Sequence, residues 1–268
     1  GGFNLDRSAL KSPIATFASV GGAQALVGNL QFDPELVDSY ELGAKFSNGP
    51  LGLSVSAFRS DFSNFQLNTF NGTVFLVQSI NGCGTDLAGA DRDQSLSAAG
   101  TNFNAAAATT GACAASDVGY GVRAQGVELE ASLVPARNFR MAAGLTYAKT
   151  SYRDNLVGSK TGAPLDPALR KLPGDNLSNA PELVATSSVT WTPDIGSNGM
   201  SGLVYIDGRM TSDYNTGSDL FPQKEQDGYA LFNARIGLRG PDQRWSVELW
   251  GQNIFNKDYA QVAFNSPF

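Results

Sequence analysis

Four pairs of alternating segments constrain the fold of this chain most strongly. In each pair, a run of about a dozen residues is followed by a short turn and a second run of similar length, which is the pattern of a β-hairpin. The turns lie at residues 47–50, 135–138, 192–199 and 240–243, and the connections between the pairs are longer, polar and rich in Gly and Asn. Short turns that alternate with long connections are typical of an outer-membrane β-barrel.

Within these runs, apolar and polar residues alternate with a period of two, which indicates strands with two different faces. Val127, Leu129 and Leu133 alternate with Glu128 and Glu130, and the same pattern recurs in 139–147, 230–238 and 245–249. The alternation is less regular after the third turn. We therefore expect the charged residues of the strands to lie on one face only.

The pattern predicts eight strands, at residues 39–47, 51–63, 121–134, 139–151, 181–192, 200–213, 228–239 and 244–256. A further hairpin is expected within residues 65–80, and residues 1–3 are expected to end an earlier strand. The chain is therefore predicted to be all-β, with about 8 to 10 antiparallel strands.

Alternation alone does not distinguish a soluble β-sandwich, whose apolar faces point inward, from a membrane barrel, whose apolar face meets lipid. Strands of about ten to thirteen residues are long enough to cross a bilayer at a tilt. Trp191 and Trp245 lie beside short turns, where a barrel carries a girdle of aromatic residues. These observations, together with the asymmetry of the connections, favour the membrane barrel.

The composition excludes several classes of function. No window of eighteen apolar residues exists, so no transmembrane helix is predicted, and a net charge of -6 provides no basic surface for nucleic acid. The chain contains no His, which removes His-dependent catalytic triads and His-ligated zinc or haem from this segment. Glu128 and Glu130 could pair as the carboxylates of a glycosidase, but two carboxylates that line a channel are the simpler interpretation. We therefore predict that the chain is not an enzyme and holds no cofactor.

Three stretches, in this order and at this spacing, resemble the late barrel strands of TonB-dependent outer-membrane receptors. They are 38–58 (DSYELGAKFSNGPLGLSVSAF), 125–130 (QGVELE) and 250–259 (WGQNIFNKDY). The resemblance covers nearly the whole chain except about residues 81–118, which we expect to be an inserted extracellular loop.

The resemblance implies that residues 1–268 are the C-terminal part of a 22-stranded outer-membrane barrel. It further implies import energised through TonB, with a ferric siderophore as the most expected ligand and cobalamin or oligosaccharides after it. The plug domain and the TonB box are not visible in this segment, so TonB would act through a missing N-terminal region, and Phe268 is expected to be a truncation point. Outer-membrane lipid and lipopolysaccharide are the other implied partners.

The two cysteines both lie in the expected loop. A pair in an exported, Ala- and Gly-rich segment is most simply a disulfide, so we predict a bond between Cys83 and Cys113. Asp86, Asp91 and Asp93 could offer oxygen ligands to calcium, but their spacing lacks the Gly and the later Glu of a hand-type loop. We interpret these three residues as solvated loop acids and predict no metal site.

Ligand-contacting residues can be suggested only by residue type and position. Tyr214 and Phe221 lie in the loop after the sixth strand, Phe70 and Phe75 lie near a hairpin tip, and Arg209 lies near the outer end of a strand. Two other functions remain open on the sequence: a passive porin or small self-contained barrel closed by the eight strands, and a soluble β-sandwich that acts as a binding module.

Overall fold

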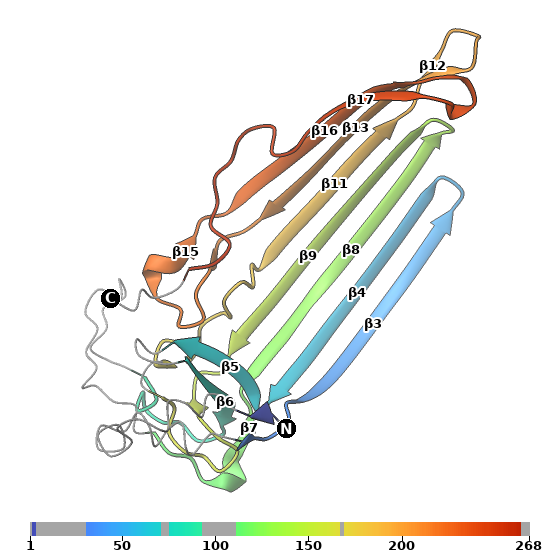
Figure 1. The fold of residues 1–268 in the computed structure, drawn as a ribbon. Helices are drawn as coiled ribbons and strands as arrows, with labels where there is room; N and C mark the ends of the chain where they lie inside the picture. The colour runs from blue at the N-terminus through green and yellow to red at the C-terminus, as the bar shows by residue number, and fades with distance from the viewer. Residues whose placement is uncertain (1, 4–30, 71–74, 93–110, 167–168, 264–268) are drawn as a thin grey trace.

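The structure, a computed structural model, describes residues 2–3, 31–70, 75–92, 111–166 and 169–263. Its main element is one sheet of long strands (Figure 1). In chain order these are β3 (Leu36–Asn48), β4 (Leu51–Ser63), β8 (Val122–Ala136), β9 (Phe139–Tyr152), β11 (Leu183–Trp191), β13 (Met200–Thr211), β16 (Tyr229–Arg239) and β17 (Ser246–Gly251). The spatial order is β17-β16-β13-β11-β9-β8-β4-β3, with every pair antiparallel, and short β12 (Asp194–Ile195) adds to β13. The predicted all-β antiparallel architecture is confirmed.

The four predicted hairpins are present, and their turns lie together at one end of the sheet, which we call the turn end (Figure 1). In the first turn, Gly49 has a φ of 53°, a left-handed conformation that glycine adopts without a steric penalty. The long connections lie at the opposite end, which we call the loop end (Figure 1). Consecutive long strands are therefore connected alternately by a tight turn at the turn end and by a long segment, which we call an excursion, at the loop end.

The register gives the sheet two distinct faces. Val55, Leu129, Leu145 and Ala185 are direct neighbours across four strands and belong to the apolar face, whereas their sequence neighbours point to the polar face. Large side chains on the apolar face are exposed; Leu129, for example, retains 42% of its surface. Within the described ranges no second sheet covers this face, so the sandwich interpretation is wrong.

The expectation that strand charges occupy one face only is also wrong. Arg59, Asp61, Arg123 and Lys149 share the register of the apolar residues, and they all lie toward the loop end of their strands. The apolar face therefore consists of an uncharged region toward the turns and a charged region near the loops.

The long sheet is open. In the described part of the chain, β3 pairs only with β4 and β17 pairs only with β16, so each edge strand has a partner on one side. The alternative in which these eight strands close into a small barrel is therefore wrong for this structure. An open sheet with two long edges is the arrangement expected of a piece of a larger barrel.

The last predicted strand is too long, because β17 ends at Gly251 rather than at residue 256. Asn253 and Asn256 have φ values of 48° and 49°, which break the extended conformation. The Asn253 side chain stabilises the resulting turn, since its Oδ1 accepts a hydrogen bond of 2.9 Å from the Lys257 amide. The other long strands agree with the prediction to within a few residues.

A second group of short strands lies at the loop end. Strands β5 (Phe65–Phe70), β6 (Phe75–Cys83) and β10 (Leu156–Val157) form a sheet in the order β10-β6-β5, and β7 (Val118–Tyr120) also pairs with β6. The hairpin predicted within residues 65–80 is present, but it belongs to this separate sheet. Two further pairs are β1 (Gly2–Phe3) with β2 (Gln31–Phe32) and β14 (Tyr214–Asn215) with β15 (Glu225–Gln226). The only helices among the described residues are short 3₁₀ turns, and none of these could cross a membrane.

The largest cluster of buried apolar side chains in the described residues lies at the loop end. Val122 and Tyr152, at the ends of β8 and β9, contribute to this loop-end core. Its other buried members are Leu67, Ile80, Leu156, Leu165, Leu169, Leu172 and Leu220. The described parts of the excursions between the long strands therefore pack against one another.

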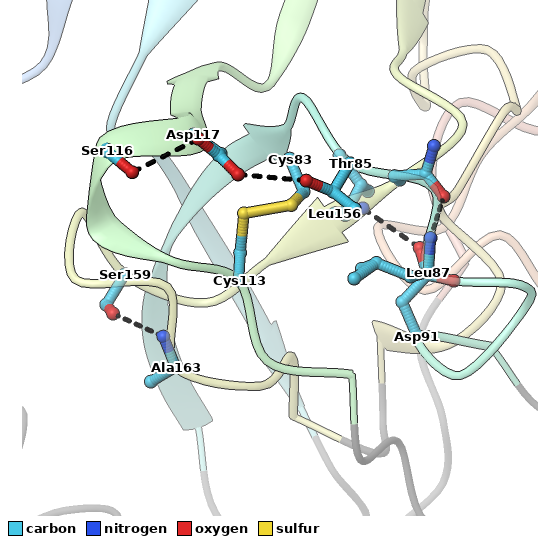
Figure 2. The surroundings of a disulfide bond; sticks show 11 residues. Cys83, Thr85, Leu87, Asp91, Cys113, Ser116, Asp117, Leu156, Ser159 and Ala163 are labelled. Carbon is cyan, nitrogen blue, oxygen red and sulfur yellow. Dashed lines mark hydrogen bonds between the residues drawn. A yellow bond between two sulfur atoms is a disulfide. The ribbon is translucent and has the colours of Figure 1, made fainter.

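A disulfide joins Cys83 to Cys113 beside this core, as the sequence predicts (Figure 2). Cys83 is the last residue of β6 and is 1% exposed, and the two Cα atoms are 5.9 Å apart. Strand β6 continues to Cys83 and β7 begins at Val118, so strands occupy both ends of the 81–118 range. Hydrogen bonds such as that from Thr85 Oγ1 to Asp117 support the segment on either side of the bond.

Asp91 is not the solvated loop acid that the sequence indicates. Its side chain is fully buried, and its Oδ2 accepts a hydrogen bond of 2.9 Å from the Leu156 backbone amide (Figure 2). Its Oδ1 lies 3.5 Å from Arg92 Nε. Asp86 is exposed and bonds to the Ala88 amide, whereas Asp93 lies outside the described residues. Asp91 therefore has a structural role in joining two loop segments.

A pair of asparagines fixes the start of the β5–β6 hairpin, and this gives a first testable prediction. Asn81 Oδ1 accepts a hydrogen bond of 2.8 Å from the backbone amide of Asn64, and Asn81 Nδ2 donates a hydrogen bond to Asn64 Oδ1. Both residues are buried. Asn81→Ala leaves the Asn64 amide without this partner, so we expect a loss of about 1 to 3 kcal/mol in loop-end stability. The rate of hydrogen exchange at the backbone amide of Asn64 would measure this loss of stability. The control variant is Asn68→Ala, at an exposed position of β5. Equal exchange in both variants would contradict the prediction.

Candidate functional site

The polar face of the long sheet carries rows of hydrogen-bonding side chains that cross several strands. The register places one row on six neighbouring strands, from β3 to β13. This row consists of Lys45, Ser54, Glu130, Gly144, Thr186 and Arg209. The next row toward the turn end consists of Ser47, Gly52, Ser132, Ala142, Ser188, Asp207 and Asn233.

All members of these two rows except Asn233 line a hollow of about 880 Å³ on the sheet. Small residues leave the space open: a Cβ on Gly144 would come within 2.8 Å of Thr186 Oγ1, and a Cβ on Gly52 within 2.7 Å of Ser132 Oγ. Larger polar residues stand at its two sides, with Lys45 on β3 and Tyr205, Asp207 and Arg209 on β13. The hollow is large enough for a ligand of several hundred daltons.

The polar face carries both acidic and basic side chains. Asp207 accepts a bond of 2.8 Å from Asn233 Nδ2, and Glu248 lies 3.5 Å from Arg235 and 3.4 Å from Arg239. Glu128 and Glu130 are both exposed on the polar face of β8. The described polar face therefore presents both hydrogen-bond donors and hydrogen-bond acceptors.

A second hollow, of about 380 Å³, lies at the loop end of β13 and β16. Four carboxylates line it, from Asp175, Asp213, Glu225 and Asp227, together with Tyr214. The Tyr214 hydroxyl lies 3.4 Å from that of Tyr229 and donates to the Ala260 carbonyl at 3.2 Å. Tyr229 in turn stacks on Tyr259, so three tyrosines hold the segment after β17 against the β13–β16 loop.

The suggested ligand-contacting residues fall into separate places. Arg209 is exposed in the large hollow, and Tyr214 lines the second hollow. Phe221 lines neither; its carbonyl accepts a bond from Asn215 Nδ2 and its ring lies 5.9 Å from Lys224 Nζ. The backbones of Phe70 and Phe75 face each other across the tip of the β5–β6 hairpin, and their side chains lie outside the described structure.

Sequence reasoning by residue type missed most of the residues that line these hollows. Ser54, Gly144 and Thr186 are unremarkable in sequence and become neighbours only through the strand register. The acidic residues on both sides of the β13–β16 loop, Asp213 and Glu225, were a usable signal, since both lie within the same connection.

Comparison with known families identifies one match over most of the chain. The profile of the TonB-dependent receptor-like β-barrel family matches residues 5–254. Solved structures with the same fold include the ferric yersiniabactin uptake receptor FyuA from Yersinia pestis, with a TM-score of 0.58 and 15% identity over 88% of this chain. The ferric-catecholate import receptor Fiu from K12 E. coli has a TM-score of 0.53 and 18% identity over 89% of this chain.

The copper transporter OprC is also similar, with a TM-score of 0.50 and 16% identity over 86% of this chain. Identities this low establish the fold alone. The chain spans 27% of FyuA, 26% of Fiu and 27% of OprC, so it corresponds to about a quarter of each of these proteins.

Proposed function

Because the chain belongs to the family of TonB-dependent receptor β-barrels, we propose that it forms part of the wall of an outer-membrane importer that is energised through TonB. The family is one of transport receptors rather than enzymes. In this proposal the apolar face meets lipid, the polar face lines the lumen, the turn end is periplasmic and the loop end is extracellular. The segment 81–118 is then part of an extracellular excursion.

The single observation that supports this function best is the pairing of an exposed apolar face with a hollowed polar face on one open sheet. A soluble protein rarely leaves an apolar face of this size uncovered, whereas a bilayer provides the cover that this sheet lacks. The two free edges, β3 and β17, provide the positions at which further strands would continue the wall. We propose a ferric siderophore as the ligand.

Uptake by the full-length receptor tests the proposal. Cells that express the receptor as their only route for a ferric siderophore should accumulate ⁵⁵Fe from a panel of ferric siderophores, and deletion of TonB should abolish the accumulation. Equal accumulation with and without TonB would show a passive pore instead. Failure with every ferric siderophore, but TonB-dependent uptake of another solute such as cobalamin, would retain the importer and reject the iron ligand.

Arg209 provides a second test, inside the lumen. Its guanidinium is exposed in the large hollow and could donate charge-assisted hydrogen bonds to ligand oxygens. We expect Arg209→Gln to weaken ligand binding about tenfold, which is the effect of losing one such bond. Arg235→Gln is the matched control, because Arg235 lies on the same face but is placed beside Glu248 outside the hollow lining. Equal affinities in the two variants, measured by titration, would contradict a ligand site at Arg209.

A further inference from the structure

The balance of charge on the polar face changes from the large hollow toward the turn end. The two rows that line the hollow carry two cations, Lys45 and Arg209, and two carboxylates, Glu130 and Asp207. Nearer the turns, the polar-face positions of β9, β11, β13, β16 and β17 carry three arginines and one carboxylate, which are Arg140, Arg235, Arg239 and Glu248. The polar face of these strands is therefore positively charged toward the turn end.

One row in this region joins five neighbouring strands and contains no acid. It consists of Arg140, Thr190, Tyr205, Arg235 and Trp250, on β9, β11, β13, β16 and β17. We call these five residues the arginine row. Each of the five side chains carries a hydrogen-bond donor. The backbones of Arg140 and Arg235 are three strand spacings apart, or roughly 14 Å.

The two arginines of this row keep donors available. Arg140 is exposed and forms no ion pair within the part of the chain that the structure describes. A small hollow of about 130 Å³ lies beside Arg140, and Thr190 also lines it. Arg235 retains 49% of its side-chain surface, and its partner Glu248 is shared, lying 3.5 Å from Arg235 and 3.4 Å from Arg239. Because one carboxylate cannot occupy every donor of two guanidiniums, this end of the polar face has donors to spare.

The carboxylate in the adjacent row toward the loop end already has a partner. Asp207 lies two residues from Tyr205 on the same face of β13, and its Oδ2 accepts a hydrogen bond of 2.8 Å from Asn233 Nδ2. The other carboxylate of the large hollow, Glu130, lies on β8, three strands away from Arg209. The arginine row is therefore an acid-free band between the large hollow and the turn end.

We infer that the arginine row is a second binding position for the transported ferric complex, between the large hollow and the turn end, and that this complex is negatively charged. The inference rests on the proposed function and deepens it, because it requires the polar face to line the lumen. Arg209 and Tyr205 are four residues apart on β13, or roughly 13 Å, so a ligand first held near Arg209 reaches the row after a short displacement.

The chemistry of the row matches a complex that carries several anionic oxygens. Guanidiniums at two separated positions can donate to carboxylate or catecholate oxygens on different sides of one ferric complex. The hydroxyl-bearing residues Thr190 and Tyr205 lie between the two arginines. Trp250, which is 63% exposed, adds an aromatic surface at the β17 end. An uncharged complex would gain no comparable attraction from this part of the wall.

Uptake kinetics of the full-length receptor test the row. The probes are ⁵⁵Fe complexes of a tricatecholate and of a hydroxycarboxylate, which are negatively charged, and of a trihydroxamate, which is uncharged. We expect TonB-dependent uptake to favour a negatively charged probe. For that probe, Arg140→Gln/Arg235→Gln should lower the maximal uptake rate about tenfold, the effect of losing roughly one charge-assisted bond at the barrier to passage. The affinity measured by titration should change by no more than about twofold, because Arg209 is retained at the first position.

Two further variants separate charge from structure. Arg140→Lys/Arg235→Lys keeps both positive charges and should retain most of the uptake rate. Arg137→Gln/Arg244→Gln is the matched control, since it removes two exposed cations from the turns, where each lies beside a carboxylate, and it should leave the rate unchanged. If the arginine row instead anchors a static segment of the receptor, Arg140→Gln/Arg235→Gln should also admit a glycopeptide antibiotic too large to cross an intact outer membrane. That result would overturn the inference.

Three other results would also overturn it. These are uptake of the uncharged probe at least as fast as that of the charged probes, an unaltered rate in Arg140→Gln/Arg235→Gln, and an equal loss of rate in the row and turn variants. The unaltered receptor separates this inference from the proposed function. TonB-dependent iron uptake that none of these substitutions changes rejects the arginine row alone, whereas absence of such uptake in the unaltered receptor rejects both.

Discussion

Leu129→Arg and Ile236→Arg should each destabilise the full-length receptor in a bilayer by about 2 to 4 kcal/mol. Both residues belong to the uncharged part of the apolar face, where Leu129 is 42% and Ile236 54% exposed. If lipid surrounds these side chains, an arginine there must lose water or distort the bilayer around it. Denaturant unfolding of the receptor reconstituted in vesicles would measure the change in free energy.

Adjacent positions on the polar face provide matched controls. Glu128→Arg places the same side chain one residue from Leu129 on the opposite face, and we expect it to cost less than about 1 kcal/mol because surface substitutions of this kind are usually tolerated. The chain already contains Arg235 beside Ile236, with its guanidinium near Glu248. If the apolar-face and polar-face variants were equally stable, the assignment of the two faces to lipid and lumen would be wrong.

Removal of the disulfide should lower the local stability of the loop end without unfolding the long sheet. Cys83 and Cys113 are 30 residues apart, and closing a ring of that size stabilises a fold by about 3 to 4 kcal/mol on the chain-entropy account. We expect Cys83→Ser to speed hydrogen exchange near the bond by roughly several hundredfold. The amides to observe are those of Gly84 and Cys113, which bond to the carbonyls of Asp117 and Gly162.

The faster hydrogen exchange should result from the loss of the disulfide and not from the change of either side chain by itself. Cys113→Ser and the double variant should therefore match Cys83→Ser, and reduction of the unaltered receptor should reproduce all three. Heat-modifiable migration should be retained, because the long hairpins make their contacts through β-ladders that do not include either cysteine. Loss of the folded barrel in Cys83→Ser would show that the loop end is needed to assemble the wall.

The hairpins could be predicted because the sequence patterns that define them lie within short, continuous stretches of the chain. A period of two over a dozen residues defines two faces, and short turns containing Gly49 or Asn138 define where the chain reverses. The end of β17 was predicted wrongly because the same local pattern continues beyond the end of the strand. Ile254 and Phe255 continue an apolar pattern, but the left-handed conformations of Asn253 and Asn256 override it. Asn at these two positions was the available signal.

The loop-end core and the candidate site could not be predicted in the same way. Leu165, Leu169 and Leu172 have no strand period and are buried only because segments distant in sequence pack on them. Asp91 is buried beside Leu156, 65 residues away, and no local pattern indicates that contact. Likewise, the hollow on the polar face depends on which small residue lies opposite which, and this requires the register of six strands.

Residues of the long sheet and residues of the loop-end core are subject to two different kinds of sequence constraint. Residues of the long sheet must satisfy a two-residue alternation and a ladder of backbone hydrogen bonds, but most of them pack against no protein interior. Residues of the core must fit one another in shape and volume, and they meet the sheet mainly through Val122 and Tyr152. Insertions and substitutions in the excursions can therefore be accommodated by repacking one small interior. The sequence of the loop end can therefore diversify while the long sheet stays unchanged.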